Sequence, residues 1–78
     1  MLTQKKVISI ISKAVRQKVD NKSNANNIEN WDSLAQLNIL ASLDKFTKGK
    51  SSKIQQLTDA NSVKSIIQIL TKKKLISK

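Results

Sequence analysis

The chain has 78 residues, contains no cysteine or histidine, and carries a formal net charge of +10. A chain of this length is expected to form one domain over residues 1–78, with a small core that buries about 60% of the surface of the unfolded chain. Disulfide bonds are excluded, and without Cys or His no zinc, other metal or redox site is expected. The longest apolar runs are pairs and triplets, too short for a signal peptide or a membrane span. We therefore expect a cytoplasmic protein that does not enter a membrane.

The positive charge comes from fourteen lysines and one arginine, set against five acidic residues. Such a charge is typical of proteins that bind nucleic acid. However, base readout favours arginine, and stacking on single strands needs exposed aromatic rings. Arg16 is the only arginine, and Trp31 and Phe46 are the only aromatic residues. We therefore interpret the basicity as a solvated or partner-docking surface and expect no nucleic-acid partner.

Apolar residues recur with helical spacing at the start of the chain. This spacing predicts a first helix over residues 3–18, capped by Thr3. Residues 20–27 are nearly all polar and predict a long loop. Ile28 and Trp31 follow, and we expect them to pin the loop onto the core, because long free loops are uncommon in compact domains.

A second helix is predicted from residue 32 or 33 to residue 46 or 47. Its apolar residues cover much of its circumference: Leu34, Leu37 and Ala41 lie on one stripe, and Ile39, Leu43 and Phe46 on another. Such a helix is either buried on more than one side or keeps an exposed apolar strip for a partner or ligand.

Gly49, the only glycine, predicts a left-handed turn after this helix. A short helical turn over residues 54–57 and a last amphipathic helix capped by Asn61 or Ser62 follow. Leu75 and Ile76 could fold back on the core, or the tail from about residue 73 could fray. With no strand signal, the pattern predicts an all-α fold, a small four-helix bundle with three longer helices, a short third helix and a long loop after the first.

The tetrapeptide Trp31-Asp32-Ser33-Leu34 marks the start of the second helix. One interpretation is structural: Ser33 is the N-cap and forms a capping box with Gln36, or Asp32 caps and Ser33 lies in the first turn. The other is functional: an exposed hydroxyl is modified by a separate enzyme, and the helix N-terminus stabilises an attached phosphate.

The run from Asn30 to Leu40 closely resembles the start of the second helix of acyl carrier proteins and peptidyl carrier domains. In that family an Asp-Ser-Leu motif presents the serine that receives 4′-phosphopantetheine, and Asp32-Ser33-Leu34 matches it. The family also has a first helix, a long loop, a short third helix and a final amphipathic helix. The resemblance thus covers nearly the whole chain and implies a carrier domain with a bundle of the acyl-carrier type.

The resemblance implies that the chain is not an enzyme and has no catalytic residues. Ser33 would carry 4′-phosphopantetheine derived from coenzyme A, and Asp32 would support its transfer. An acyl or aminoacyl intermediate would then be held as a thioester on this arm in bacterial fatty-acid or secondary-metabolite biosynthesis. The implied partners are a phosphopantetheinyl transferase and the enzymes that activate and transfer the acyl or aminoacyl group, with the carrier itself a monomer. The residues that could line an acyl cleft, or belong to an ordinary core, are Leu34, Leu37, Ala41, Ile54 and Leu57.

The charge departs from the family pattern. Family members are commonly acidic along the second helix, whereas this chain has a predicted lysine cluster of Lys45, Lys48, Lys50 and Lys53. Like charges oppose docking to enzymes with basic patches, so a specialised pathway is expected. The competing hypothesis is a small basic helical module that binds nucleic acid or protein, with Ser33 only an N-cap.

Overall fold

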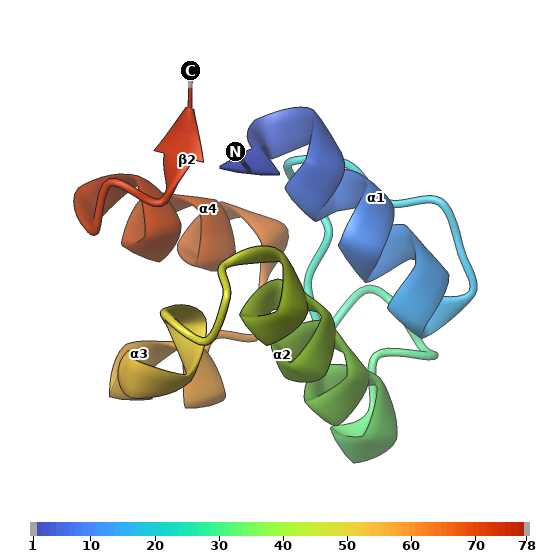
Figure 1. The fold of residues 1–78 in the computed structure, drawn as a ribbon. Coiled ribbons are helices and arrows are strands. Elements are labelled where there is room, and N and C mark those ends of the chain that lie inside the picture. The colour runs from blue at the N-terminus through green and yellow to red at the C-terminus, as the bar shows by residue number, and fades with distance from the viewer. Residues whose placement is uncertain (1, 78) are drawn as a thin grey trace.

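Helices make up most of the chain in the computed structural model, which describes residues 2–77 except for the side chains of Ser52 and Ser77. Figure 1 shows their arrangement, with α2 at the centre between α1 on one side and α3 and α4 on the other. The elements are β1 (Leu2–Thr3), α1 (Gln4–Val15), α2 (Ser33–Phe46), the 3₁₀ helix η1 (Ser51–Lys53), α3 (Gln55–Thr58), α4 (Val63–Lys72) and β2 (Ile76–Ser77). The predicted small helical bundle is confirmed at this level.

Helix α1 begins at the predicted cap and ends earlier than predicted. The Thr3 hydroxyl accepts a hydrogen bond from the Lys6 amide at 3.1 Å. The helix stops at Val15 because Arg16 takes a left-handed conformation with φ 57°. The chain then turns back, and the Ser12 hydroxyl accepts from the amide of buried Val19 at 3.2 Å. The predicted extension to residue 18 was therefore wrong, because a side-chain hydrogen bond to the loop replaces the next helical turn.

Helix α2 has the predicted limits and satisfies both expectations for an unusually apolar helix. Ala35, Ile39 and Leu43 are buried on the side that faces the core. Leu34 and Leu37 remain 67% and 63% exposed. The helix is thus packed by several elements and still presents an apolar strip to solvent near its N-terminus.

The connection after α2 contains a left-handed turn, as predicted at Gly49, whose φ is 85°. The buried Thr47 hydroxyl donates to the Leu43 carbonyl at 2.8 Å and accepts from the Ser51 amide at 3.0 Å. The amide–hydroxyl bond leads into η1, an element that the sequence pattern did not predict. Further on, Ser62 caps α4, with its hydroxyl accepting from the Ser65 amide at 3.1 Å.

The first and last described residues of the chain lie side by side. Strands β1 and β2 pair in parallel, with Leu2 opposite Ile76, and both of these side chains are buried. The tail therefore folds back on the core as far as it is described. No strand was predicted, because two-residue strands are too short to show an alternating pattern. None of the helices within residues 2–77 has the length and apolar character needed to cross a membrane.

Candidate attachment site at Ser33

The long loop before Ser33 is held by backbone contacts to the start of α4. The Ala25 amide donates to the Asn61 carbonyl at 2.8 Å, and the Val63 amide donates to the Ser23 carbonyl at 3.0 Å. Ile28 and Trp31 are buried, 6% and 5% exposed. These contacts confirm that the two apolar residues pin the loop, and they add a short backbone bridge that the sequence did not reveal.

Gln36 connects the residues before Ser33 to the far side of the bundle. Its Oε1 atom accepts from the indole Nε1 of Trp31 at 2.8 Å. Its Nε2 atom donates to the Ala60 carbonyl at 2.8 Å, with longer contacts of 3.4 Å to the carbonyls of Leu57 and Thr58. One side chain thus fixes the indole next to the site and links it to the α3–α4 connection.

Asp32, and not Ser33, caps α2. The Asp32 carboxylate accepts from the Ala35 amide at 2.9 Å, and its carbonyl accepts from the Gln36 amide at 2.9 Å. Ser33 is the first residue of the helix. Of the two alternatives, the one in which Asp32 caps and Ser33 lies in the first turn is therefore confirmed. The capping box between Ser33 and Gln36 does not form, because Gln36 is engaged by Trp31 and Ala60 and the Asp32 carboxylate takes the cap position.

The Ser33 side chain is exposed and forms no hydrogen bond with any of the described residues. It lies in the first turn of a 14-residue helix, where backbone N–H groups lack helical partners and the dipole is positive. Its hydroxyl is thus accessible to another enzyme, in an environment that suits an attached phosphate. These features fit the covalent phosphodiester that the resemblance implies.

Four of the five predicted cleft residues line one groove between α2 and the η1–α3 segment. Leu37 and Ala41 contribute from α2, and Ile54 and Leu57 lie opposite. The groove has a volume of about 360 Å³, with Leu37 63% exposed and Leu57 buried. The predicted residues therefore combine both interpretations, since Leu57 belongs to the core while Leu37 is open to solvent.

Leu34 lies outside this groove. It lines a smaller cavity of about 180 Å³ between α1 and α2, together with Asp32, Asn38 and Arg16. The helical spacing of Leu34 and Leu37 suggested one shared stripe, but Leu37 lines the groove toward η1 and α3 whereas Leu34 lines the cavity toward α1. Leu34 is thus placed beside Ser33 and toward α1.

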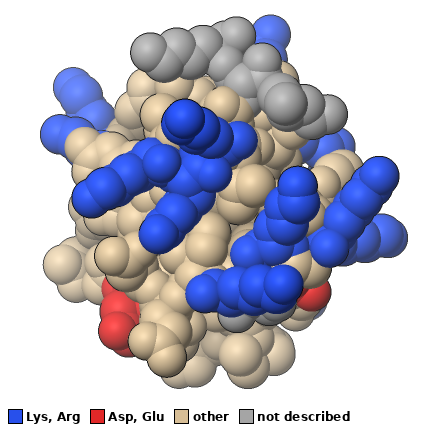
Figure 2. All heavy atoms as spheres, turned by 60° about the vertical axis from the view of Figure 1, so that its left-hand side comes forward, with Lys and Arg blue, Asp and Glu red and all other residues tan. Residues whose placement is uncertain are grey.

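Lysine side chains spread over the surface instead of forming one cluster. Figure 2 shows abundant Lys and Arg on the side of α3 and α4, with acidic side chains only in its lower half. Lys48 and Lys50 share a shallow cavity of about 280 Å³ with Lys74 from the segment after α4. Lys45 lines a different cavity, against α1. Lys45 therefore lines a different cavity from Lys48 and Lys50, although Phe46 borders both, and Lys53 lines neither of them.

The sequence did not predict the hydrogen bonds of Gln36, nor the cavity between α1 and α2 that Lys45 lines. A signal for the cavity was present, because Lys6, Ile10 and Lys13 recur at helical spacing in α1, as do Asn38, Ser42 and Lys45 in α2. The pairing of the two stripes depends on how α1 and α2 pack. No comparable local signal exists for Gln36, whose partners include a carbonyl 24 residues away.

Comparisons with protein-family models, curated proteins and solved structures gave no significant match. The functional conclusion therefore depends on the geometry at Ser33 and on the resemblance of residues 30–40.

Proposed function

We propose that the chain is a carrier protein that receives 4′-phosphopantetheine on Ser33 and holds an acyl or aminoacyl group as a thioester on that arm. The observation that carries this proposal is the exposed Ser33 hydroxyl, which the fold does not use as a cap because Asp32 does. A serine at this position is otherwise a common structural residue, and here that role is already filled.

The residues around Ser33 support attachment by a separate enzyme. The Ser33 oxygen would form the ester bond to phosphorus, its proton would pass to a base of the transferase, and the adenosine bisphosphate part of coenzyme A would leave. The free N–H groups at the start of α2 stabilise the resulting phosphate charge. The arm supplies the thiol that a chain without cysteine lacks.

The apolar strip beside Ser33 supports a role with an apolar cargo or partner. Leu37 is exposed at one end of the groove between α2 and α3, and Ala41, Ile54 and Leu57 continue it. Burying one exposed leucine side chain contributes about 1.5–3 kcal/mol. An acyl chain attached through Ser33 that enters this groove would gain stabilisation of this kind.

Mass spectrometry after incubation with coenzyme A and a phosphopantetheinyl transferase of broad specificity tests the proposal. We expect the addition of one phosphopantetheine group, its loss in Ser33→Ala, and its retention in Thr71→Ala, which removes a hydroxyl from α4 instead. An unmodified wild-type chain under conditions that load a known carrier would refute the proposal.

Asp32→Asn separates the two roles that Asp32 could have. Asparagine caps about as well as aspartate, so α2 should keep its start while the negative charge is removed. If the charge supports transfer, for example by orienting a metal-bound donor, the variant should fold normally and be modified more slowly. Unchanged modification kinetics would limit Asp32 to capping.

The competing function, a basic nucleic-acid-binding module, has one observation in its favour, the net charge of +10. Its premise that Ser33 is the N-cap does not hold in the structure. This function requires binding to DNA or RNA that falls steeply as salt is raised, without any covalent modification.

A further inference from the structure

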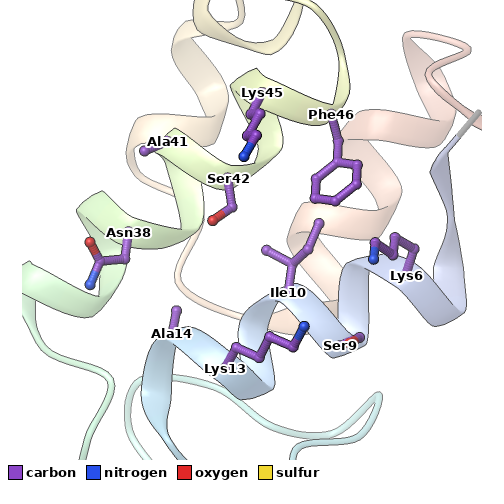
Figure 3. A pocket seen from close by; sticks show the side chains of 10 residues that line it. All are labelled: Lys6, Ser9, Ile10, Lys13, Ala14, Asn38, Ala41, Ser42, Lys45 and Phe46. Carbon is purple, nitrogen blue, oxygen red and sulfur yellow. The ribbon is translucent and has the colours of Figure 1, made fainter.

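A basic groove runs between α1 and α2 (Figure 3), and it adjoins the groove beside α3 at Ala41, which lines both. It has a volume of about 430 Å³, larger than that of the groove beside α3. Ile10 and Phe46 point toward one another across it from the two helices, and Ala14 points toward α2. Phe46 is 47% exposed, so the apolar floor of the groove opens to solvent.

The rim of this groove carries positive charge without compensation. Lys6, Lys13 and Lys45 line it, and no acidic residue does. No ion pair joins these three ammonium groups to a carboxylate of the described residues, although Lys6 Nζ lies 4.6 Å from the centroid of the Phe46 ring. Three uncompensated cations around an apolar floor favour a ligand that is apolar along one face and negatively charged at its edges.

The groove leads to the candidate attachment site. Ala14 and Asn38 line both the basic groove and the smaller cavity that contains Asp32 and Leu34. The two hollows therefore follow each other along the α1-facing side of α2, from Phe46 to the residues that flank Ser33. The length of the 14-residue helix α2 is about 20 Å, which matches about four turns of a second helix.

We propose that this basic groove docks an acidic amphipathic helix of a partner enzyme that acts on the arm at Ser33. The inference deepens the proposed carrier function and rests on it for the identity of the partner as an enzyme. A helix with apolar residues on one face fills the space over Ile10, Ala14 and Phe46, while flanking carboxylates approach Lys6, Lys13 and Lys45. Docking there holds the partner next to Ser33 and leaves Leu37, Ile54 and Leu57 in the groove beside α3 uncovered.

A protein ligand fits the groove better than nucleic acid does. The cations on its rim are lysines, which act as point charges and lack the planar fork with which arginine reads bases. Phe46 is the single aromatic residue among those that line the groove, so successive bases of a single strand have no row of rings on which to stack. An apolar floor also offers nothing to a phosphate backbone.

Binding of a synthetic peptide to the full chain tests the proposal. The probe is a fluorescein-labelled helical peptide of about fourteen residues with Leu along one face and Glu beside it, and its control has the same composition in scrambled order. Fluorescence anisotropy at low ionic strength should show that the chain binds the amphipathic peptide and does not bind the scrambled one. With ¹⁵N-labelled protein, the shifted amides should be those of residues that line the groove, among them Ile10, Lys13 and Asn38.

Charge reversal provides the decisive comparison. Lys13→Glu/Lys45→Glu should weaken peptide binding by about tenfold or more, whereas Lys64→Glu/Lys72→Glu, an equal charge change on exposed sites of α4, should change it by less than about twofold. Lys13→Gln/Lys45→Gln should give an intermediate loss, and circular dichroism checks that each variant folds. Ser33→Ala should bind the peptide normally, so that failure of the carrier function and failure of this docking site give different results.

Several results would overturn the docking proposal. Equal weakening by the two charge-reversed variants would show an effect of net charge alone. An acidic helix would be excluded as the ligand of this groove by any of three results. These are equal binding of the scrambled peptide, no binding of the amphipathic peptide, and tighter binding of a single-stranded DNA oligonucleotide.

Discussion

Replacing Gln36 by alanine should destabilise the fold strongly, although position 36 is only half-buried. The change removes two hydrogen bonds of 2.8 Å, one from the Trp31 indole and one to the Ala60 carbonyl. Each contributes about 1 kcal/mol net, and leaving the N–H of an indole in a residue that is 5% exposed without a partner costs a further amount of about 1 kcal/mol or more. We therefore expect a loss of about 3 kcal/mol in the free energy of unfolding.

For a domain of 78 residues this loss corresponds to a decrease in Tm of about 12–24 °C. Urea denaturation followed by far-UV circular dichroism measures the loss, and fluorescence of the single tryptophan reports on the site itself. Gln68→Ala, on the exposed face of α4, is the matched control and should change stability by less than about 0.5 kcal/mol.

A double-mutant cycle with Trp31→Phe isolates the indole–amide bond. The phenylalanine removes the N–H donor while keeping an aromatic ring, so the coupling free energy with Gln36→Ala should be about 1 kcal/mol. A loss in Gln36→Ala no larger than in the control, or a coupling near zero, would refute the conclusion that this side chain fixes the loop before Ser33.

Two further predictions concern α2 and the turn that follows it. Ile39→Ala, at a fully buried position, should lower the free energy of unfolding by about 2–5 kcal/mol. Leu37→Ala, at a position 63% exposed on the same helix, should lower it by less than about 1 kcal/mol. Similar losses for the two variants in chemical denaturation would contradict the assigned burial. Gly49→Ala should lower the free energy of unfolding by about 1 kcal/mol, because a φ of 85° is unfavourable for alanine. Steric crowding should add little, because the nearest atom to an added Cβ is Asp44 Oδ1 at 4.0 Å. An unchanged Tm in thermal unfolding would show that the turn relaxes.

The sequence predicted those parts of the fold that depend on local chemistry. Thr3 and Ser62 act as caps because a short hydroxyl side chain can reach an amide three residues on, whatever lies elsewhere in the chain. The limits of α2 and the turn at Gly49 were likewise predictable. Arg16 ended α1 early because its left-handed conformation depends on the path of the loop back to Val19 and Ser12.

At the candidate site, the contacts predicted from residue spacing differ from those in the folded structure. Ser33 and Gln36 have the spacing of a capping box, but Gln36 has better partners in Trp31 and Ala60. Likewise, Leu37 and Leu34 have helical spacing but line different hollows, because α3 and α1 approach α2 from different sides. Such outcomes depend on packing, which residue spacing along one helix does not contain.

The contacts that hold the loop before Ser33 also determine when, during synthesis of the chain, the site can fold. The Ser23 carbonyl needs the Val63 amide, and Gln36 needs Ala60, so the start of α2 acquires its partners only after residues 60–63 have left the ribosome. A nascent chain that ends before residue 60 contains Ser33 without this support. An enzyme that recognises the folded surface around Ser33 would therefore act only once residues up to 63 have left the ribosome, and modification would report that this part of the chain has folded.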